Sequence, residues 1–267
     1  MYRHLTSMVM AILAVVMLAG FSVPAWSISN IEETRLSTLS EGISGKLMAS
    51  IEGKSGNTNK EEYSLSGMLN VKKTNNTLIT MIERSYGKAN EIVNEDGVFW
   101  HGRLTHSYTV RTASEMFLQY EEDEFTRLQF RALAGAGLRK NFFTDNENIM
   151  FSYGLGAFRE KEKIDLVTFE AVNYTTRLNV YYSYKHALNP QCVVSNTVYY
   201  QPSYDRFSDY RVLFNLGMNV RINSKFSLQV DYQIRRDNDP PENLFLAVPL
   251  NLKKTDSNYK TSVVYEF

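Results

Sequence analysis

Few residues in this chain have the types and spacing that chemistry requires, and two histidines come first. His101 and His106 lie five residues apart. On a strand that separation places them on opposite faces, which excludes a simple paired metal site. Ser107 follows His106 directly, and a His can activate a Ser as a nucleophile, but adjacent strand residues point in opposite directions. We expect His101 to face inward with Ser107, His106 to face outward, and no catalytic residue among them.

An acidic run, residues 121–124, is the next candidate. Carboxylate oxygens suit calcium and magnesium, but the spacing of a calcium loop is absent, so a solvated turn is the favoured interpretation. Cys192 is the single cysteine, which excludes an internal disulfide and a cysteine-based metal site. We predict no metal and no cofactor. The 29 basic and 29 acidic residues balance, which argues against nucleic acid as a partner.

The elements that position these residues are predicted to be long strands. Residues 210–223 and 226–235 alternate apolar and polar side chains, a period of two that excludes a helix. Segments of about 9–14 residues exceed the usual strand of a globular sheet and match the length needed to cross a bilayer. We expect an all-β fold, an antiparallel transmembrane β-barrel of about 12 strands. The fifth strand is the weakest of them, and dropping one hairpin would give 10. The expected strands are 43–55, 61–73, 77–86, 97–111, 115–121, 126–140, 149–160, 170–186, 191–202, 208–223, 225–236 and 253–267.

The connections support this organisation because they differ in length. We expect short periplasmic turns at 74–76, 112–114, 144–148, 188–191 and 223–224, and long extracellular loops at 87–96, 160–169 and 237–252. Short turns on one side and long loops on the other are typical of outer-membrane barrels.

The start of the chain indicates export. A positive front at Arg3, an apolar run over residues 8–18 and a small-x-small site at 25–27 predict a cleaved signal peptide over residues 1–27. Residues 28–41 are interpreted as a periplasmic lead-in and residues 42–267 as one barrel domain.

The inward faces of the predicted strands carry many arginines. Charges are tolerated in a lumen and costly on a lipid-facing surface. Two interpretations stay open: the arginines pair with carboxylates and fill the interior, or they line a path for anions. A filled or narrow lumen is favoured, although fewer inward carboxylates are expected, chiefly Glu52, Glu121, Glu160, Asp231 and Glu266. The predicted lumen-lining residues are Arg103, Arg111, Arg127, Arg131, Arg139, Arg177, Arg211, Arg221 and Arg235.

The last strand ends the chain on an aromatic ring. Tyr259, Val263, Tyr265 and Phe267 share its outward face, which suits a closing strand at a membrane interface. The pattern resembles the C-terminal signature of outer-membrane barrels, and the resemblance implies an assembly signal read by the barrel-assembly machinery. Leu47, Ala49 and Ile51 of the first strand offer a matching outward face for closure.

One stretch carries a family resemblance. The run Arg131-x-Leu-x-Gly135-x-Gly137-Leu138, preceded by residues 103–107 and 115–121 and followed by Gly154-Leu-Gly156-Ala, resembles the salt-induced outer-membrane protein family, largely a domain of unknown function. The resemblance implies an outer-membrane barrel and supplies no catalytic residues. The glycines do not fit a phosphate cradle, which needs a turn before a helix. We expect them to let strands bend or to let a bulky neighbour lie across them.

The sequence therefore predicts an outer-membrane β-barrel of a Gram-negative bacterium with a structural or stress-related envelope role, or a narrow channel for small solutes or anions. Its expected partners are outer-membrane lipid, lipopolysaccharide and the barrel-assembly machinery. A lipid-modifying outer-membrane enzyme and a soluble periplasmic β protein are the alternatives.

Overall fold

The alternating segments of the sequence form long antiparallel strands. A computed structural model describes residues 40–54, 60–89, 92–123, 128–143, 148–165, 170–239 and 254–267. Within this part of the chain it contains the strands β1 (Gly42–Lys54), β2 (Lys60–Lys73), β3 (Asn76–Ala89), β4 (Ile92–Ser107), β5 (Thr112–Asp123), β6 (Leu128–Phe143), β7 (Ile149–Asp165), β8 (Glu170–Asn189), β9 (Cys192–Pro202), β10 (Tyr210–Arg221), β11 (Phe226–Asp237) and β12 (Thr255–Glu266).

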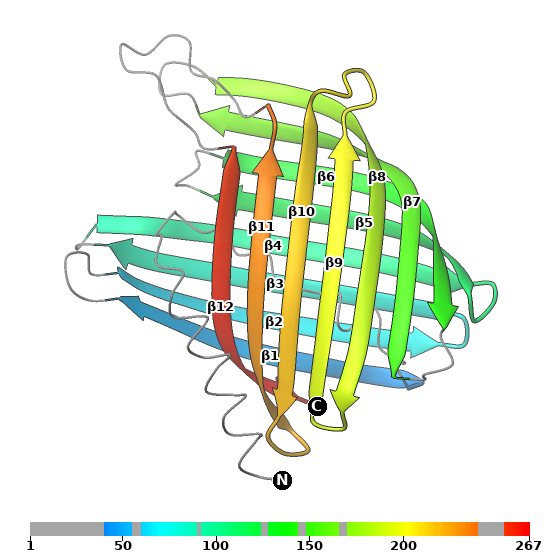
Figure 1. Cartoon of the computed structure of the whole chain (residues 1–267). Coiled ribbons are helices and arrows are strands. Elements are labelled where there is room, and N and C mark those ends of the chain that lie inside the picture. Colours follow the sequence, from blue (N-terminus) through cyan, green and yellow to red (C-terminus); the bar gives the residue numbers. More distant parts are fainter. Residues whose placement is uncertain are drawn as a thin grey trace.

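These strands close into a barrel. Each strand pairs with its neighbour in the chain, and β1 pairs with β12. In Figure 1 strands β9 to β12 stand in front, while β1 to β4 cross behind them at a steep angle, as the strongly tilted walls of a barrel do. The predicted antiparallel barrel of about 12 strands is confirmed. The 10-strand alternative is wrong, because β5 is a full strand of 12 residues.

The two faces of the wall have opposite polarity. Outward side chains include Leu65, Met116 and Leu155, which are 64%, 61% and 62% exposed. The buried inward side chains are mostly serine, threonine, asparagine, glutamate and arginine. A water-soluble protein has the reverse arrangement, whereas an apolar outer band around a polar interior is the pattern of an outer-membrane-type barrel.

No helix of the described residues is long and apolar enough to cross a membrane.

Two predicted loops are largely strand. Residues 87–96 were expected as a long loop, but β3 continues to Ala89 and β4 begins at Ile92. Likewise β7 runs through 160–165 to Asp165. Both segments are rich in charged residues, so their sequences look like those of solvated loops. Their backbones nevertheless remain paired with the neighbouring strands in the antiparallel sheet. The signal peptide, most of the lead-in and most of the loop 237–252 lie outside the described residues.

The seam between β1 and β12 closes the barrel through a short ladder. Five residue pairs are in register, with Leu47 opposite Tyr265 and Ala49 opposite Val263, compared with eleven pairs between β11 and β12. One further pair of backbone hydrogen bonds joins Gly45 and Phe267, whose N–H groups donate to each other's carbonyl at 2.9 and 3.0 Å. The predicted closure of the last strand on the first is confirmed.

An aromatic row covers the end of this seam. The ring of Phe267 is 59% exposed on the outer face and lies over Gly45, where a Cβ atom would overlap it. The Tyr265 ring stands 6.2 Å from Phe267 and 5.3 Å from Phe226, centroid to centroid. Tyr259 and Val263 share this exposed face. Gly45 is therefore the position at which the last ring of the chain can rest on the first strand.

Candidate functional site

The predicted lumen-lining arginines fall into three groups. Arg111 is exposed in the turn before β5, and Arg221 is exposed at the end of β10, so neither belongs to the buried interior. Arg127 lies outside the described residues. The remaining six are on inward positions of the wall, where they are buried or nearly so: Arg103, Arg131, Arg139, Arg177, Arg211 and Arg235.

Glu160 of β7 is the centre of a buried ion network. Its side chain is 1% exposed, and three arginines converge on it. Arg131 Nη2 lies 2.8 Å from Oε2, Arg177 Nε lies 2.6 Å from Oε1, and Arg211 Nη1 lies 3.0 Å from Oε2. Both carboxylate oxygens thus accept charge-assisted hydrogen bonds, the stronger class of hydrogen bond in proteins.

Further carboxylates surround these arginines. Arg211 reaches Glu162 through Nη2 and Asp237 through Nε, each at 2.9 Å. Arg177 Nη1 lies 2.9 Å from Asp209. Glu121 lies 3.6 Å from both Arg131 and Arg235. We call the whole group the ion network; its members are Glu121, Arg131, Glu160, Glu162, Arg177, Asp209, Arg211, Arg235 and Asp237.

The ion network crosses the interior of the barrel. Arg211 is on β10 and Glu160 is on β7, so two strands of the wall, β8 and β9, separate them. A contact between them bridges the lumen as a chord rather than following the wall. Because buried charges are stable only when paired and hydrogen bonded, the paired groups hold these strands together across the lumen.

The balance of charge differs from expectation. Five carboxylates of the ion network face four guanidinium groups. The expectation that inward carboxylates are fewer is wrong. Those that it missed are buried at inward positions: Glu62, Glu83, Glu115, Asp123 and Glu162. Their alternation within each strand was the available signal, and for Glu162 the predicted loop at 160–169 concealed it.

A second cluster, centred on Glu115, lies toward the other end of the barrel. Arg103 Nη1 and Arg139 Nη1 lie 2.9 and 3.0 Å from its two oxygens. The Tyr181 hydroxyl donates to Glu115 Oε2 at 2.8 Å. Tyr181 is on β8 and Glu115 is on β5, so this contact also spans two intervening strands. The lumen is therefore bridged at two levels.

The glycines of the family-like run make room for these bridges. A Cβ atom on Gly154 would overlap the ring of Tyr181, and one on Gly135 would overlap Phe117 and Phe158. The two phenylalanine rings meet edge to face with centroids 6.3 Å apart. As expected, the missing side chains let bulky neighbours lie across strands β6 and β7.

The histidines take separate positions, as expected. His101 is buried between the rings of Phe99 and Phe117, each with its centroid 6.4 Å away, and it accepts a long 3.5 Å hydrogen bond from Arg103 Nε. His106 faces the other side of the wall, 2.9 Å from the side chain of Asn76. Stacking and a guanidinium partner give His101 a packing role.

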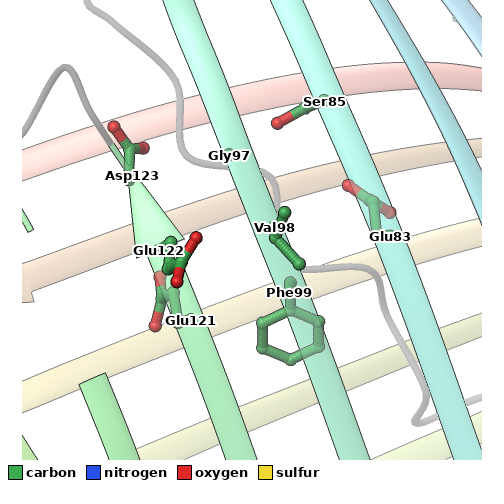
Figure 2. A pocket seen from close by; sticks show the side chains of 8 residues that line it. All are labelled: Glu83, Ser85, Gly97, Val98, Phe99, Glu121, Glu122 and Asp123. Atoms are coloured by element: carbon green, nitrogen blue, oxygen red, sulfur yellow. The ribbon is translucent and has the colours of Figure 1, made fainter. Parts of the chain in front are cut away.

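A small acidic pocket opens beside the ion network. Figure 2 shows the carboxylates of Glu83, Glu121 and Asp123 around Gly97 and Phe99, from strands β3, β4 and β5. Its volume of about 20 Å³ holds about one water molecule.

The expected solvated turn at 121–124 is wrong for Glu121 and Asp123, which are buried residues of β5. Glu83 binds Lys260 Nζ of β12 at 2.9 Å. Within the described ranges no group of His, Cys, Asp and Glu has the arrangement of a metal site.

Comparisons with known proteins agree with this architecture. The family model described as "Protein of unknown function, DUF481" matches residues 47–267. Among solved structures, the translocator domain of autotransporter NalP from Neisseria meningitidis is 10% identical with a TM-score of 0.51, covering 88% of this chain and 91% of that one. The NanC porin is 6% identical, with a TM-score of 0.46 and coverages of 84% and 98%. An anion-selective porin from Comamonas acidovorans is also 6% identical, with a TM-score of 0.42 and the same coverages. No curated protein matches the chain. At 10% identity the likeness to the translocator domain shows the fold alone.

Proposed function

Since this chain belongs to the DUF481 family of proteins of unknown function, we propose from its own interior that it is an integral β-barrel of a Gram-negative outer membrane whose lumen is closed at rest. Its role in the envelope is then structural or stress-related, and it does not serve as a general diffusion pore. Lipopolysaccharide, outer-membrane lipid and the barrel-assembly machinery are its proposed partners. The terminal aromatic row with Phe267 is the proposed assembly signal.

The observation that carries this proposal is the convergence of three arginines on Glu160. Arg131, Arg177 and Arg211 come from β6, β8 and β10, and all three are buried together with the carboxylate. An open aqueous pore keeps its charged residues solvated along the wall, whereas here they satisfy one another across the lumen. The ion network also joins opposite sides of the ring, because Arg235 of β11 lies 3.6 Å from Glu121 of β5. Twelve strands enclose less space than the 16-stranded porins, which favours closure by such a network.

The charges of the ion network do not favour an anion channel. Five carboxylates oppose four guanidinium groups, so the described residues at this level carry no excess of positive charge. The narrow-channel alternative is therefore left as an outcome of the conductance test below.

Planar-bilayer recording of the refolded protein tests the closed lumen. We expect the wild type to give no sustained conductance in concentrated potassium chloride. The double variant Glu160→Ala with Arg211→Ala, which removes one crossing of the lumen, should conduct. The matched control is Arg84→Ala with Asp96→Ala, which removes an ion pair from the outer face of β3 and β4 and should stay silent. A wild-type protein that conducts steadily would contradict the proposal.

A further inference from the structure

The outer face of β7 changes character along its length. Starting at one end, its outward side chains are Phe151, Tyr153, Leu155 and Ala157, all of them apolar or aromatic. The next three outward positions are basic: Arg159, Lys161 and Lys163. We call these three residues the basic strip. A cation is costly on the lipid-facing surface at the bilayer centre and tolerated near the interface. The basic strip therefore lies at the level of the lipid headgroups.

The basic strip lies at the end of the barrel opposite the two termini of the barrel domain. It precedes the connection between β7 and β8, which is on the same side as the long connection between β11 and β12, while Gly42 and Phe267 lie at the opposite end. With both termini on the periplasmic side, as the proposed function requires, the strip meets the outer leaflet. Alternate residues of a strand stand roughly 6.6 Å apart on one face, so the three cations span about 13 Å.

Neighbouring side chains fix Arg159 and Lys161 without neutralising their charges. Arg159 Nη1 donates to Thr176 Oγ1 at 3.1 Å. The Lys161 ammonium lies 5.3 Å from the ring centroid of Phe130 and 5.5 Å from that of Tyr174, both within range of a cation–π contact. Among the described residues, neither Arg159 nor Lys161 has a carboxylate partner, whereas Lys163 binds Glu170 at 2.8 Å.

The residues of β6 in register with Arg159 and Lys161 are small. Ala134 is in register with Arg159, and Ala132 is in register with Lys161. Both alanines have outward positions, and their short side chains cover neither cation. A guanidinium and an ammonium group, each with donors to spare, therefore lie side by side on the outer face at the level of the lipid headgroups.

We infer that the basic strip binds a phosphate group of lipopolysaccharide in the outer leaflet, with Arg159 and Lys161 as the contacting cations. This inference rests on the proposed location in the outer membrane. Phosphate oxygens accept from both a guanidinium and an ammonium group, and the charge-assisted contacts are stronger than neutral ones. The apolar positions below Arg159 lie against the acyl chains of the same lipid.

The test compares lipid A with lipid A from which the phosphates have been removed, each titrated into the full-length barrel in nanodiscs. Each basic residue near an anionic headgroup contributes about fivefold in affinity, so Arg159→Gln with Lys161→Gln should bind phosphorylated lipid A about 30-fold more weakly. The control is Arg84→Gln with Lys88→Gln, which removes two exposed outer-face cations of β3 near the same end of the barrel and should bind as the wild type does.

Three results would overturn the inference: equal binding of dephosphorylated lipid A, unchanged affinity of the Arg159 and Lys161 variant, or competition by inorganic phosphate at the affinity of the lipid. Membrane fractionation keeps the two proposals separate. A wild-type protein absent from the outer-membrane fraction refutes the proposed function, whereas a correctly located protein with an unchanged variant refutes only the lipid site.

Discussion

Removing the charge of Glu160 tests whether the ion network holds the barrel together. Glu160→Gln keeps the shape of the side chain and leaves Arg131, Arg177 and Arg211 without their shared carboxylate. Breaking a buried ion pair from one side costs about 3–5 kcal/mol. The surrounding carboxylates still offer partners to the arginines, so we expect the lower end of that range, about 3 kcal/mol in the free energy of unfolding.

Urea unfolding of the barrel in lipid vesicles measures this loss. Trp100, whose indole donates to Thr80 Oγ1 at 3.1 Å on the outer face, provides the fluorescence signal. The control is Glu266→Gln, because Glu266 is 33% exposed and pairs with Lys46 at 3.1 Å. A partly exposed pair of this kind is worth about 0–1 kcal/mol.

The result that would refute this reasoning is a Glu160→Gln barrel as stable as the Glu266→Gln barrel. A double-mutant cycle with Arg211→Gln adds a second check. Directly contacting residues of one network couple by about 0.5–3 kcal/mol, and two residues that act independently would show a coupling near zero.

The other predictions concern the glycines, the end of the chain and the closed barrel itself. Gly154→Ala should lower the free energy of unfolding by about 1–3 kcal/mol because it overpacks the site of the Tyr181 ring, whereas Gly67→Ala meets ordinary contact distances and should be tolerated; equal effects in urea unfolding would contradict this. Phe267→Ala should reduce the amount of barrel assembled in cells, and Phe142→Ala, another exposed outer-face aromatic, should not; equal yields in the membrane fraction would remove the assembly signal. The folded wild type should migrate differently on a gel before and after boiling, and identical migration would exclude a stable barrel.

The alternation of side chains was enough to predict the wall. The period of two over residues 210–223 corresponds to β10 and the predicted turn at 223–224 to the connection before β11. The outward set of Leu47 and Ala49 anticipated their pairing with the last strand. These features are local, because the face of a residue in a strand depends only on its position in that strand.

The alternation of side chains could not predict the contacts that bridge the lumen. Alternation assigns Glu160 and Arg211 to the inner face and cannot say which inward residues meet, because that depends on the tilt and stagger of the closed barrel. Glu115 and Tyr181 illustrate the same limit, since they come from strands separated by two others. Charge density misled the prediction at 160–169, where a solvated loop and a strand that rises beyond the apolar band look alike in sequence.

The five-pair ladder between β1 and β12 has a consequence for how the barrel comes apart. An interface with fewer backbone hydrogen bonds than its neighbours opens at a lower free energy, and amide exchange reports such openings strand by strand. Under tension or mild heating β1 and β12 should separate before any other pair of strands. The amide of Val263, which is in register with Ala49 of β1 in this ladder, would then exchange with deuterium sooner than that of Met218, which lies in the middle of eleven-pair ladders on both sides.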